Sequence, residues 1–159
     1  MPETHIVVCT TCRLPGTTRE QAADGLSLFD VVQEALWTAE SEAGTALNLQ
    51  LRGQACMSGC NRACTLAVQA EGKWTYYWGD LTPDSEIATQ VVACARQHAL
   101  SPDGALDWKS RPKRLQSRLV NLPAKRPPRT WPKPLPSQRA VRRLGRSARL
   151  RNRPPPNRR

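Results

Sequence analysis

The chain has 159 residues, enough for one domain of ordinary size, and carries 24 lysines and arginines against 13 aspartates and glutamates. The formal net charge of +11 is unevenly divided: residues 1–110 hold every acid and are net −6, whereas residues 111–159 hold 17 bases and no acid. This division excludes a uniformly basic nucleic-acid-binding domain and indicates a mildly acidic domain with a basic, proline-rich tail. No apolar run reaches the ~18–20 residues of a membrane span, and no leader pattern is visible, so we expect a cytoplasmic protein that does not bind membranes.

The first half of the acidic part predicts a strand, a helix and a second strand. The β-branched run over 5–8 is typical of a buried strand. Apolar residues recur every three or four positions over 28–39, which predicts a helix that begins near Ser27 and ends at Gly44. Leucines alternate with other residues over 46–51, which predicts a half-buried strand.

The second half of the acidic part predicts a hairpin and a second helix. Residues 66–68 and 73–78 are typical of two strands, and the turn Glu71-Gly72 between them is short enough to make the pair antiparallel. Residues 84–100 carry an apolar stripe at helical spacing and stop at the turn over 101–104.

The order of these elements predicts an α/β fold with a mixed four-stranded sheet and two main helices. The long strand–helix–strand connection allows the first two strands to be parallel, whereas the hairpin adds an antiparallel pair. A mixed sheet with this chain order has the thioredoxin-like topology.

Four of the six cysteines follow the first two predicted strands. Cys9 and Cys12 come after the first strand, and Cys56 and Cys60 come after the second. In a cytoplasmic protein such clusters indicate metal ligands or redox groups rather than a disulfide framework. Four thiolates suit a tetrahedral zinc ion or a 2Fe-2S cluster, and the amides around Gly59 would stabilise the charge of a cluster.

Two alternatives to an iron–sulfur cluster remain open at this point. The same four cysteines could hold zinc in a structural or metal-delivery module, although a Cys-x3-Cys pair is wider than the common zinc knuckle. Cys9 and Cys12 could instead form the redox pair of a thiol–disulfide oxidoreductase. That enzyme would not require Cys56 and Cys60, and the predicted helix does not begin directly at the first pair, where its dipole would lower a thiol pKa.

The motifs Cys9-Thr10-Thr11-Cys12-Arg13, 56–67, 72–76 and 101–104 together resemble a small bacterial family of predicted metal-binding proteins of unknown function. That family is similar to thioredoxin-like 2Fe-2S ferredoxins, and the resemblance extends over about residues 5–123. It implies that Cys9, Cys12, Cys56 and Cys60 hold a 2Fe-2S cluster and that the protein is a one-electron carrier rather than an enzyme. The carrier would then exchange electrons with a redox protein partner. One feature departs from the ferredoxin pattern, whose first cysteine pair is more widely spaced.

The other two cysteines and the two histidines have simpler expectations. Cys64 is a candidate reserve ligand or a core residue, and Cys94 lies on the apolar face of the second helix, where we expect a core residue. His5 and His98 do not neighbour either cysteine pair, so we expect surface or core histidines rather than ligands.

The chain therefore divides into a thioredoxin-like, ferredoxin-type metal-binding domain over 1–110, an extended surface segment over 111–124 and a tail over 125–159. The tail alternates arginine with proline, and its high charge and few apolar residues predict disorder. Three interpretations of it stay open: an anchor for nucleic acid or another anionic surface, a solvated extension, and a frameshifted or otherwise non-native ending.

Overall fold

The computed structural model describes residues 2–125, so the predicted disordered tail lies almost wholly outside the described residues. The elements in chain order are β1 (Thr4–Cys9), α1 (Asp24–Ala43), β2 (Leu49–Gln54), the 3₁₀ helix η1 (Cys60–Arg62), β3 (Leu66–Gln69), β4 (Trp74–Trp78), α2 (Ser85–Leu100), α3 (Lys113–Gln116) and β5 (Leu119–Lys125). Every strand and helix expected over residues 5–100 is present.

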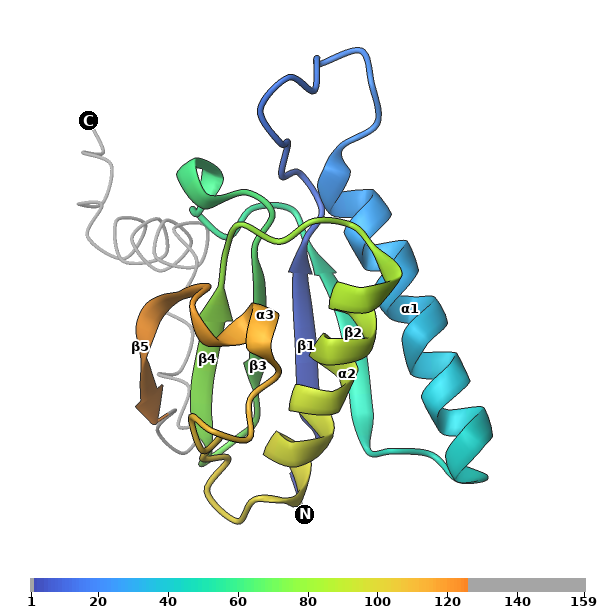
Figure 1. Ribbon diagram of the computed structural model, residues 1–159, viewed down its shortest axis with the longest axis vertical. Helices are drawn as coiled ribbons and strands as arrows, with labels where there is room; N and C mark the ends of the chain where they lie inside the picture. Colours follow the sequence, from blue (N-terminus) through green and yellow to red (C-terminus); the bar gives the residue numbers. More distant parts are fainter. Residues whose placement is uncertain (1, 126–159) are drawn as a thin grey trace, which may run out of the picture. The chain divides into compact units, whose positions relative to one another are not determined.

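The sheet has the strand order β2-β1-β3-β4-β5 (Figure 1). β1 and β2 are parallel, with Thr4 opposite Leu49, and β3, β4 and β5 continue the sheet in antiparallel pairs. The parallel β1-α1-β2 unit followed by the β3–β4 hairpin and α2 is the thioredoxin-like arrangement. The predicted α/β fold class is confirmed.

The sheet has a fifth strand that the sequence pattern does not predict. Residues 111–124, expected to lie extended on the surface, include α3 and most of β5. Leu115 of α3 is fully buried, and its carbonyl accepts a hydrogen bond of 3.0 Å from the indole nitrogen of Trp78. Contacts with β4 hold this segment in place. The segment is short and basic, and its sequence has no periodic pattern from which these contacts could be predicted.

Helices α1 and α2 pack side by side over one face of the sheet (Figure 1). The core between them combines apolar side chains from both layers: Ile6, Val8, Leu28, Val32, Leu36, Leu66, Val68, Trp78, Ile87 and Val91. Each fully buried side chain of this size contributes roughly 1.5–3 kcal/mol through the hydrophobic effect. The core thus fixes the ends of β1 and β2 from which the cysteine loops emerge.

The start of α1 differs from the prediction, whereas its end matches. The helix begins at Asp24, three residues before Ser27, and its Asp24 carboxylate accepts a hydrogen bond of 2.8 Å from the backbone amide of Leu14. This contact depends on the folded loop before the helix, so the local sequence pattern places the helix start too late. Gly44 ends the helix in the left-handed conformation, with φ of 63°, as expected for a glycine at this position.

Helix α2 is capped at both ends. Asp84 precedes it and accepts a hydrogen bond of 2.8 Å from the amide of Ile87. At the other end the buried amine of Lys73 donates to the carbonyl oxygens of His98 and Ala99, at 3.0 and 2.7 Å. These contacts satisfy backbone groups that a helix leaves unpaired at its ends.

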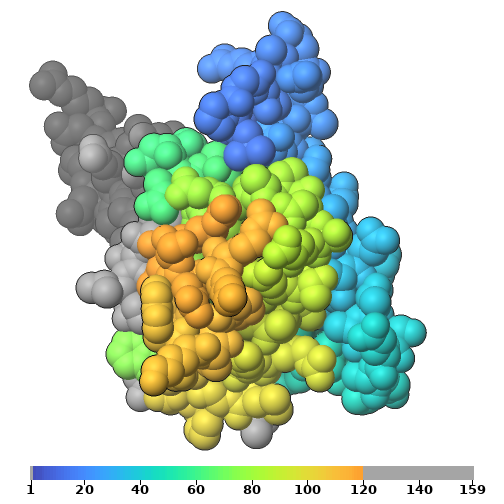
Figure 2. Space-filling view, viewed as in Figure 1, coloured from blue at the N-terminus to red at the C-terminus, as the bar shows by residue number. Residues whose placement is uncertain are grey.

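The loop of residues 13–23 projects beyond the ends of β1 and β2 (Figures 1 and 2). The Arg13 guanidinium organises it by donating to the carbonyl oxygens of Thr18 and Gln21, at 2.6 and 2.7 Å. Over residues 2–125, no helix combines the length and apolar character that crossing a bilayer requires.

Candidate metal centre

The four predicted ligand cysteines lie at or after the carboxyl ends of β1 and β2, two parallel strands whose following loops leave the same end of the sheet (Figure 1). Cys9 is the last residue of β1, Cys56 comes two residues after β2, and Cys60 begins η1. Adjacent parallel strands deliver their following loops to the same sheet edge, so the two pairs are neighbours for a topological reason.

Cys9 and Cys12 form a buried pair. Their exposed fractions are 1% and 2%, and each thiol shifts the pKa of the other. Each sulfur also meets a threonine hydroxyl: Cys9 Sγ lies 3.7 Å from Thr11 Oγ1, and Cys12 Sγ lies 3.6 Å from Thr65 Oγ1. A polar shell therefore surrounds both thiols even though solvent does not reach them.

The surroundings shift the two thiol pKa values in opposite directions. Burial disfavours the Cys9 thiolate, but hydrogen bonds from Cys12, Thr11 and the backbone of Met57 outweigh it and lower the pKa of Cys9. Burial also disfavours the Cys12 thiolate and is reinforced by neighbouring Cys9, so the pKa of Cys12 is raised despite its hydrogen bond with Thr65. The first ionisation thus belongs to Cys9.

The second pair lies on an exposed loop next to the first. Cys56 and Cys60 are both exposed, and the sulfur of Cys56 accepts a hydrogen bond of 3.4 Å from the amide of Ser58. Ser58 has a φ of 57°, a left-handed conformation that turns its amide toward the preceding sulfur. The backbone of this loop therefore acts on sulfur from both pairs: the Ser58 amide donates to Cys56, and the backbone of Met57 helps to lower the pKa of Cys9.

The threonines between Cys9 and Cys12 connect the two loops. The amide and hydroxyl of Thr10 both donate to the carbonyl oxygen of Gln54, at 2.9 and 3.2 Å. The Thr11 hydroxyl donates to the carbonyl oxygen of Ala55, the residue before Cys56. The stem of the second cysteine loop is thus fixed to the first.

The structure brings Cys9 and Cys12 together and places Cys56 and Cys60 on the adjoining loop. Within residues 2–125, no three histidine, cysteine, aspartate or glutamate side chains converge as a set that could hold a metal ion. The donor chemistry nevertheless fits a thiolate-bound group, because the thiols are free and backbone amides point at sulfur.

Three residues of this site carry no sequence signal of their own. Thr65, Met57 and Tyr77 contact the cysteines or their loop, and each lies in or beside an element whose pattern indicates only packing. They become part of the site when β3 and β4 fold beside β1. Of these three, Thr65 is the polar residue that directly follows a cysteine in the sequence, but nothing in that position shows that it faces Cys12.

Cys64 and Cys94 are both core residues. Cys64 is fully buried beside the first pair, and burial together with Cys12, Asp24 and Cys9 raises its pKa to about 12. Burial within α2 raises the pKa of Cys94 to about 12. Cys64 therefore remains a candidate reserve ligand by position, whereas Cys94 lies in the packed core, as predicted.

The two histidines lie away from the cysteines, as expected. His98 is fully buried, with Nε2 2.7 Å from the carbonyl oxygen of Trp74 and Nδ1 3.2 Å from the Thr4 hydroxyl. Burial lowers the pKa of His98, in spite of the hydrogen bond to Trp74. His5 is partly exposed and lies 4.0 Å from Glu3.

The amino-terminal end of α1 packs against the buried pair. The amide of Gly25 donates to the carbonyl oxygen of Cys12 at 3.0 Å, and a Cβ at Gly25 would lie 2.0 Å from the carbonyl oxygen of Cys9. Only glycine permits this approach. The loop of residues 13–23 thus separates α1 from Cys9 and Cys12 in the sequence, but in the folded protein the first residues of α1 contact both cysteines.

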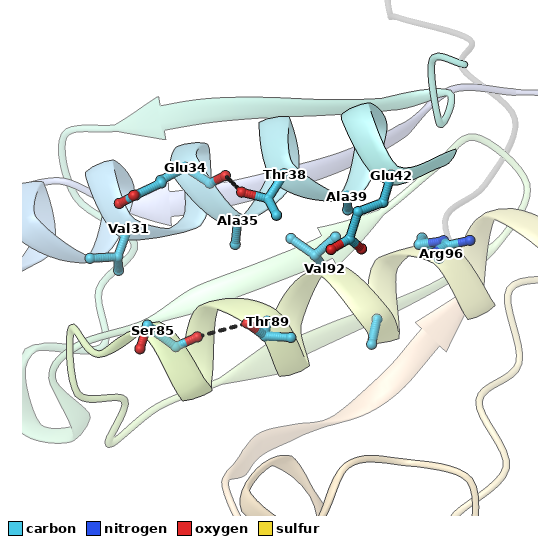
Figure 3. A pocket seen from close by; sticks show the side chains of 11 residues that line it. Val31, Glu34, Ala35, Thr38, Ala39, Glu42, Ser85, Thr89, Val92 and Arg96 are labelled. Carbon is cyan, nitrogen blue, oxygen red and sulfur yellow. Dashed lines mark hydrogen bonds between the residues drawn. The ribbon is translucent and has the colours of Figure 1, made fainter. Parts of the chain in front are cut away.

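A surface groove of about 370 Å³ lies between α1 and α2 (Figure 3). Its floor is made of small and apolar side chains, including Ala35, Ala39 and Val92, and Glu42 and Arg96 lie near one end. No cysteine or histidine lines this groove, so its chemistry is unlike that of the cysteine site.

Comparison with solved structures finds thioredoxin-like 2Fe-2S ferredoxins from Aquifex aeolicus. One is 17% identical, with a TM-score of 0.46, and the match covers 85% of this chain and 99% of that chain. A second, the wild-type protein, is 18% identical, with a TM-score of 0.42 and coverage of 61% and 88%. No curated protein matches the sequence. A family described as proteins of unknown function, DUF1636, matches residues 6–128, and the chain belongs to this family.

Proposed function

We propose that this protein binds a 2Fe-2S cluster through the thiolates of Cys9, Cys12, Cys56 and Cys60 and acts as a one-electron carrier. The observation that carries the proposal is the buried, hydrogen-bonded Cys9–Cys12 pair beside a loop that presents Cys56 and Cys60. The resemblance to the ferredoxin cysteine pattern supports the same ligand set, although the first pair of that pattern is more widely spaced.

The polar groups around the sulfurs suit a redox cluster. Hydrogen bonds to ligand sulfurs stabilise the added electron, and burial of half the ligand set limits access of water. The Thr11 and Thr65 hydroxyls and the amide of Ser58 supply such hydrogen bonds. When bound, the cluster would supply one-electron chemistry, and these residues would tune its potential.

The charge of helix α1 suggests the kind of partner. Residues 111–125 add five bases to the −6 of residues 1–110, so the folded part is nearly neutral as a whole, but α1 carries five acidic residues and no basic one. A carrier with this acidic helix would meet a redox protein with a basic surface, and the encounter would weaken as salt concentration rises.

The ligand set is tested by anaerobic reconstitution with iron and sulfide of the wild-type protein and of alanine variants at single cysteines. We expect the visible absorption bands and the paramagnetic signal of the reduced cluster to be lost in Cys9→Ala, Cys12→Ala, Cys56→Ala and Cys60→Ala. The Cys94→Ala variant is the matched control and should load like the wild type. A colourless wild-type protein with one zinc ion would instead support the zinc module.

A second candidate function is thiol–disulfide exchange by Cys9 and Cys12. The opposite pKa shifts favour it, because a lowered thiol pKa suits the attacking sulfur and a raised one suits the resolving sulfur. In that reaction the two thiols lose two protons and two electrons to a disulfide substrate, whose sulfurs leave as thiols. A metal-free protein with a reversible Cys9–Cys12 disulfide would support this function and exclude both metal sites.

A further inference from the structure

The hydroxyl of Tyr77 connects the sheet to the loop that carries Cys56 and Cys60. Side chains alternate along β4, so Tyr77 points to the face opposite that of Tyr76 and Trp78. Its hydroxyl donates to the carbonyl oxygen of Met57 at 3.0 Å. The backbone of Met57 also helps to lower the pKa of the Cys9 thiol. Met57 is therefore anchored to the sheet and acts on the buried pair.

Gly59 lets the loop lie directly on Tyr77 and Thr65. A Cβ at Gly59 would lie 2.2 Å from the Tyr77 hydroxyl oxygen and 2.6 Å from Cγ2 of Thr65, both closer than real contacts allow. Thr65 in turn contacts the sulfur of Cys12. The same two side chains thus touch the exposed loop and the buried pair.

The electrostatics of Tyr77 agree with this position. Burial is the largest cause of the raised pKa of its hydroxyl, and Cys12, Cys9 and Cys56 each raise it further, against the hydrogen bond with Thr65. The hydroxyl is therefore close to thiols from both cysteine pairs. No other tyrosine is in this position, because Tyr76 instead accepts a hydrogen bond of 2.8 Å from the amide of Leu106.

We infer that Tyr77 is the positioning residue that holds the Cys56–Cys60 loop against Cys9 and Cys12. Its hydroxyl anchors Met57, and its ring edge with Thr65 forms the surface on which Gly59 rests. The consequence for metal release rests on the proposed function: opening this loop would withdraw two ligands, so Tyr77 would slow that release.

The test compares Tyr77→Phe with the matched control Tyr76→Phe. Both variants lose one hydroxyl that bonds to the backbone, from neighbouring residues on opposite faces of the sheet. In the metal-free, reduced protein we measure the rate at which iodoacetamide labels Cys9 by mass spectrometry, with complete labelling of Cys9 in the denatured protein as the reference. We expect labelling of Cys9 to be about tenfold faster in Tyr77→Phe, which corresponds to about 1.4 kcal/mol, and unchanged in Tyr76→Phe.

The same variants distinguish the inference from the proposed function. In the reconstituted protein, iron release to a chelator should accelerate in Tyr77→Phe by a similar factor. If no variant loads iron but Cys9 still labels faster in Tyr77→Phe, the loop anchor stands and the cluster proposal fails. Equal labelling in the wild type and Tyr77→Phe overturns the inference, and so does equal acceleration in both tyrosine variants.

A Gly59→Ala variant tests the contact from the side of the loop. The added methyl group collides with the Tyr77 hydroxyl, so we expect faster labelling of Cys9 in the wild-type background. In the Tyr77→Phe background the hydroxyl is absent, and the added effect of Gly59→Ala should be smaller. Multiplicative, independent effects of the two substitutions would contradict a direct contact between Tyr77 and the loop.

Discussion

Cys9 and Cys12 lie three residues apart, yet their surroundings prepare them for different chemistry. Both are buried, which raises a thiol pKa, but the thiol of Cys12, the hydroxyl and backbone of Thr11 and the backbone of Met57 together lower the pKa of Cys9. Cys12 has Thr65 and stands beside the group that ionises first. The difference arises from folded neighbours, so the spacing of the two cysteines predicts their proximity and not their order of ionisation.

The lowered pKa of Cys9 has a testable pH dependence. A thiol reacts as its thiolate, so labelling of Cys9 by iodoacetamide in the metal-free protein should rise to half its maximum at a pH below the ~8.5 of a free cysteine. Cys94, with its pKa raised to about 12, should remain almost unlabelled throughout that range. Peptide mass spectrometry across pH 5–10 follows both. A higher midpoint for Cys9 than for a free cysteine would contradict the hydrogen-bonding account.

The Thr65 hydroxyl offers a second test at this scale. Thr65→Val keeps the shape of the side chain and removes the hydroxyl next to Cys12 Sγ. Loss of one hydrogen bond of about 1 kcal/mol should make the reduction potential of the reconstituted cluster more negative by roughly 40 mV. Thr89→Val, which removes an exposed hydroxyl on α2, is the control and should leave the potential unchanged. Voltammetry measures both potentials. An equal potential in Thr65→Val and the wild type would show that this hydrogen bond does not affect the reduction potential.

The helix ends were partly predictable from residue types. Asp84 immediately precedes α2 and caps it as a short acidic side chain commonly does, whereas α1 begins where a distant backbone amide meets Asp24. β2 lies three residues later than the alternating leucines indicate, because its register is set by pairing with β1. Local patterns thus identify an element, and tertiary pairing decides its limits.

The cap of α2 should contribute measurably to stability. Burial opposes ionisation of Asp84, but hydrogen bonds from Thr82, the Ile87 amide and Arg114 outweigh it and lower the pKa of the carboxyl group. The contribution is therefore complete above the unfolded pKa of ~3.9 and is lost as pH falls through the lower folded pKa. We expect Asp84→Ala to reduce the free energy of unfolding by about 1–2 kcal/mol at pH 7.

Urea unfolding of the metal-free protein measures this loss. Asp30→Ala removes an exposed carboxylate from the middle of α1 and should change the free energy of unfolding by less than about 0.5 kcal/mol. The difference between Asp84→Ala and the wild type should narrow as pH falls below ~3.9. A loss that does not depend on pH in that range would show that the carboxylate charge is not involved.

The folded part of the molecule includes more of the chain than the composition suggests. The acidic part supplies four strands, both main helices and all six cysteines, and their periodicity made the fold class predictable. α3 and β5 come from the acid-free part, where few apolar residues give a periodic signal. Leu115 is nevertheless fully buried, and Arg114 bonds to both Asp84 and Glu86 beside α2. The folded unit therefore continues past the change in charge near residue 110.

Leu115 tests whether this extension is integral to the fold. Leu115→Ala leaves a cavity in the core and should reduce the free energy of unfolding by about 2–5 kcal/mol. Leu100→Ala, at a position that is 74% exposed, is the matched control and should cost less than about 0.5 kcal/mol. Chemical denaturation compares the two, and equal small effects would show that residues 111–118 do not contribute to the stable core.

The sequence predicts which cysteines belong to the candidate site but not how the folded chain brings them together. Two cysteine pairs after two parallel strands must reach one sheet edge, but the sequence does not show that one pair is buried and the other exposed. Nor does it show that Tyr77 anchors the second pair, since an aromatic residue in a strand indicates packing. The site is assembled by contacts between loops and strands that are far apart in the sequence, so no local sequence pattern reveals them.

The content of iron and acid-labile sulfide in the anaerobically prepared protein tests the central claim most directly. A 2Fe-2S cluster held by Cys9, Cys12, Cys56 and Cys60 predicts about two atoms of each per chain in the wild type and in Cys94→Ala, and neither in Cys56→Ala. A wild-type protein that contains one zinc ion, or no metal and a Cys9–Cys12 disulfide, would contradict it.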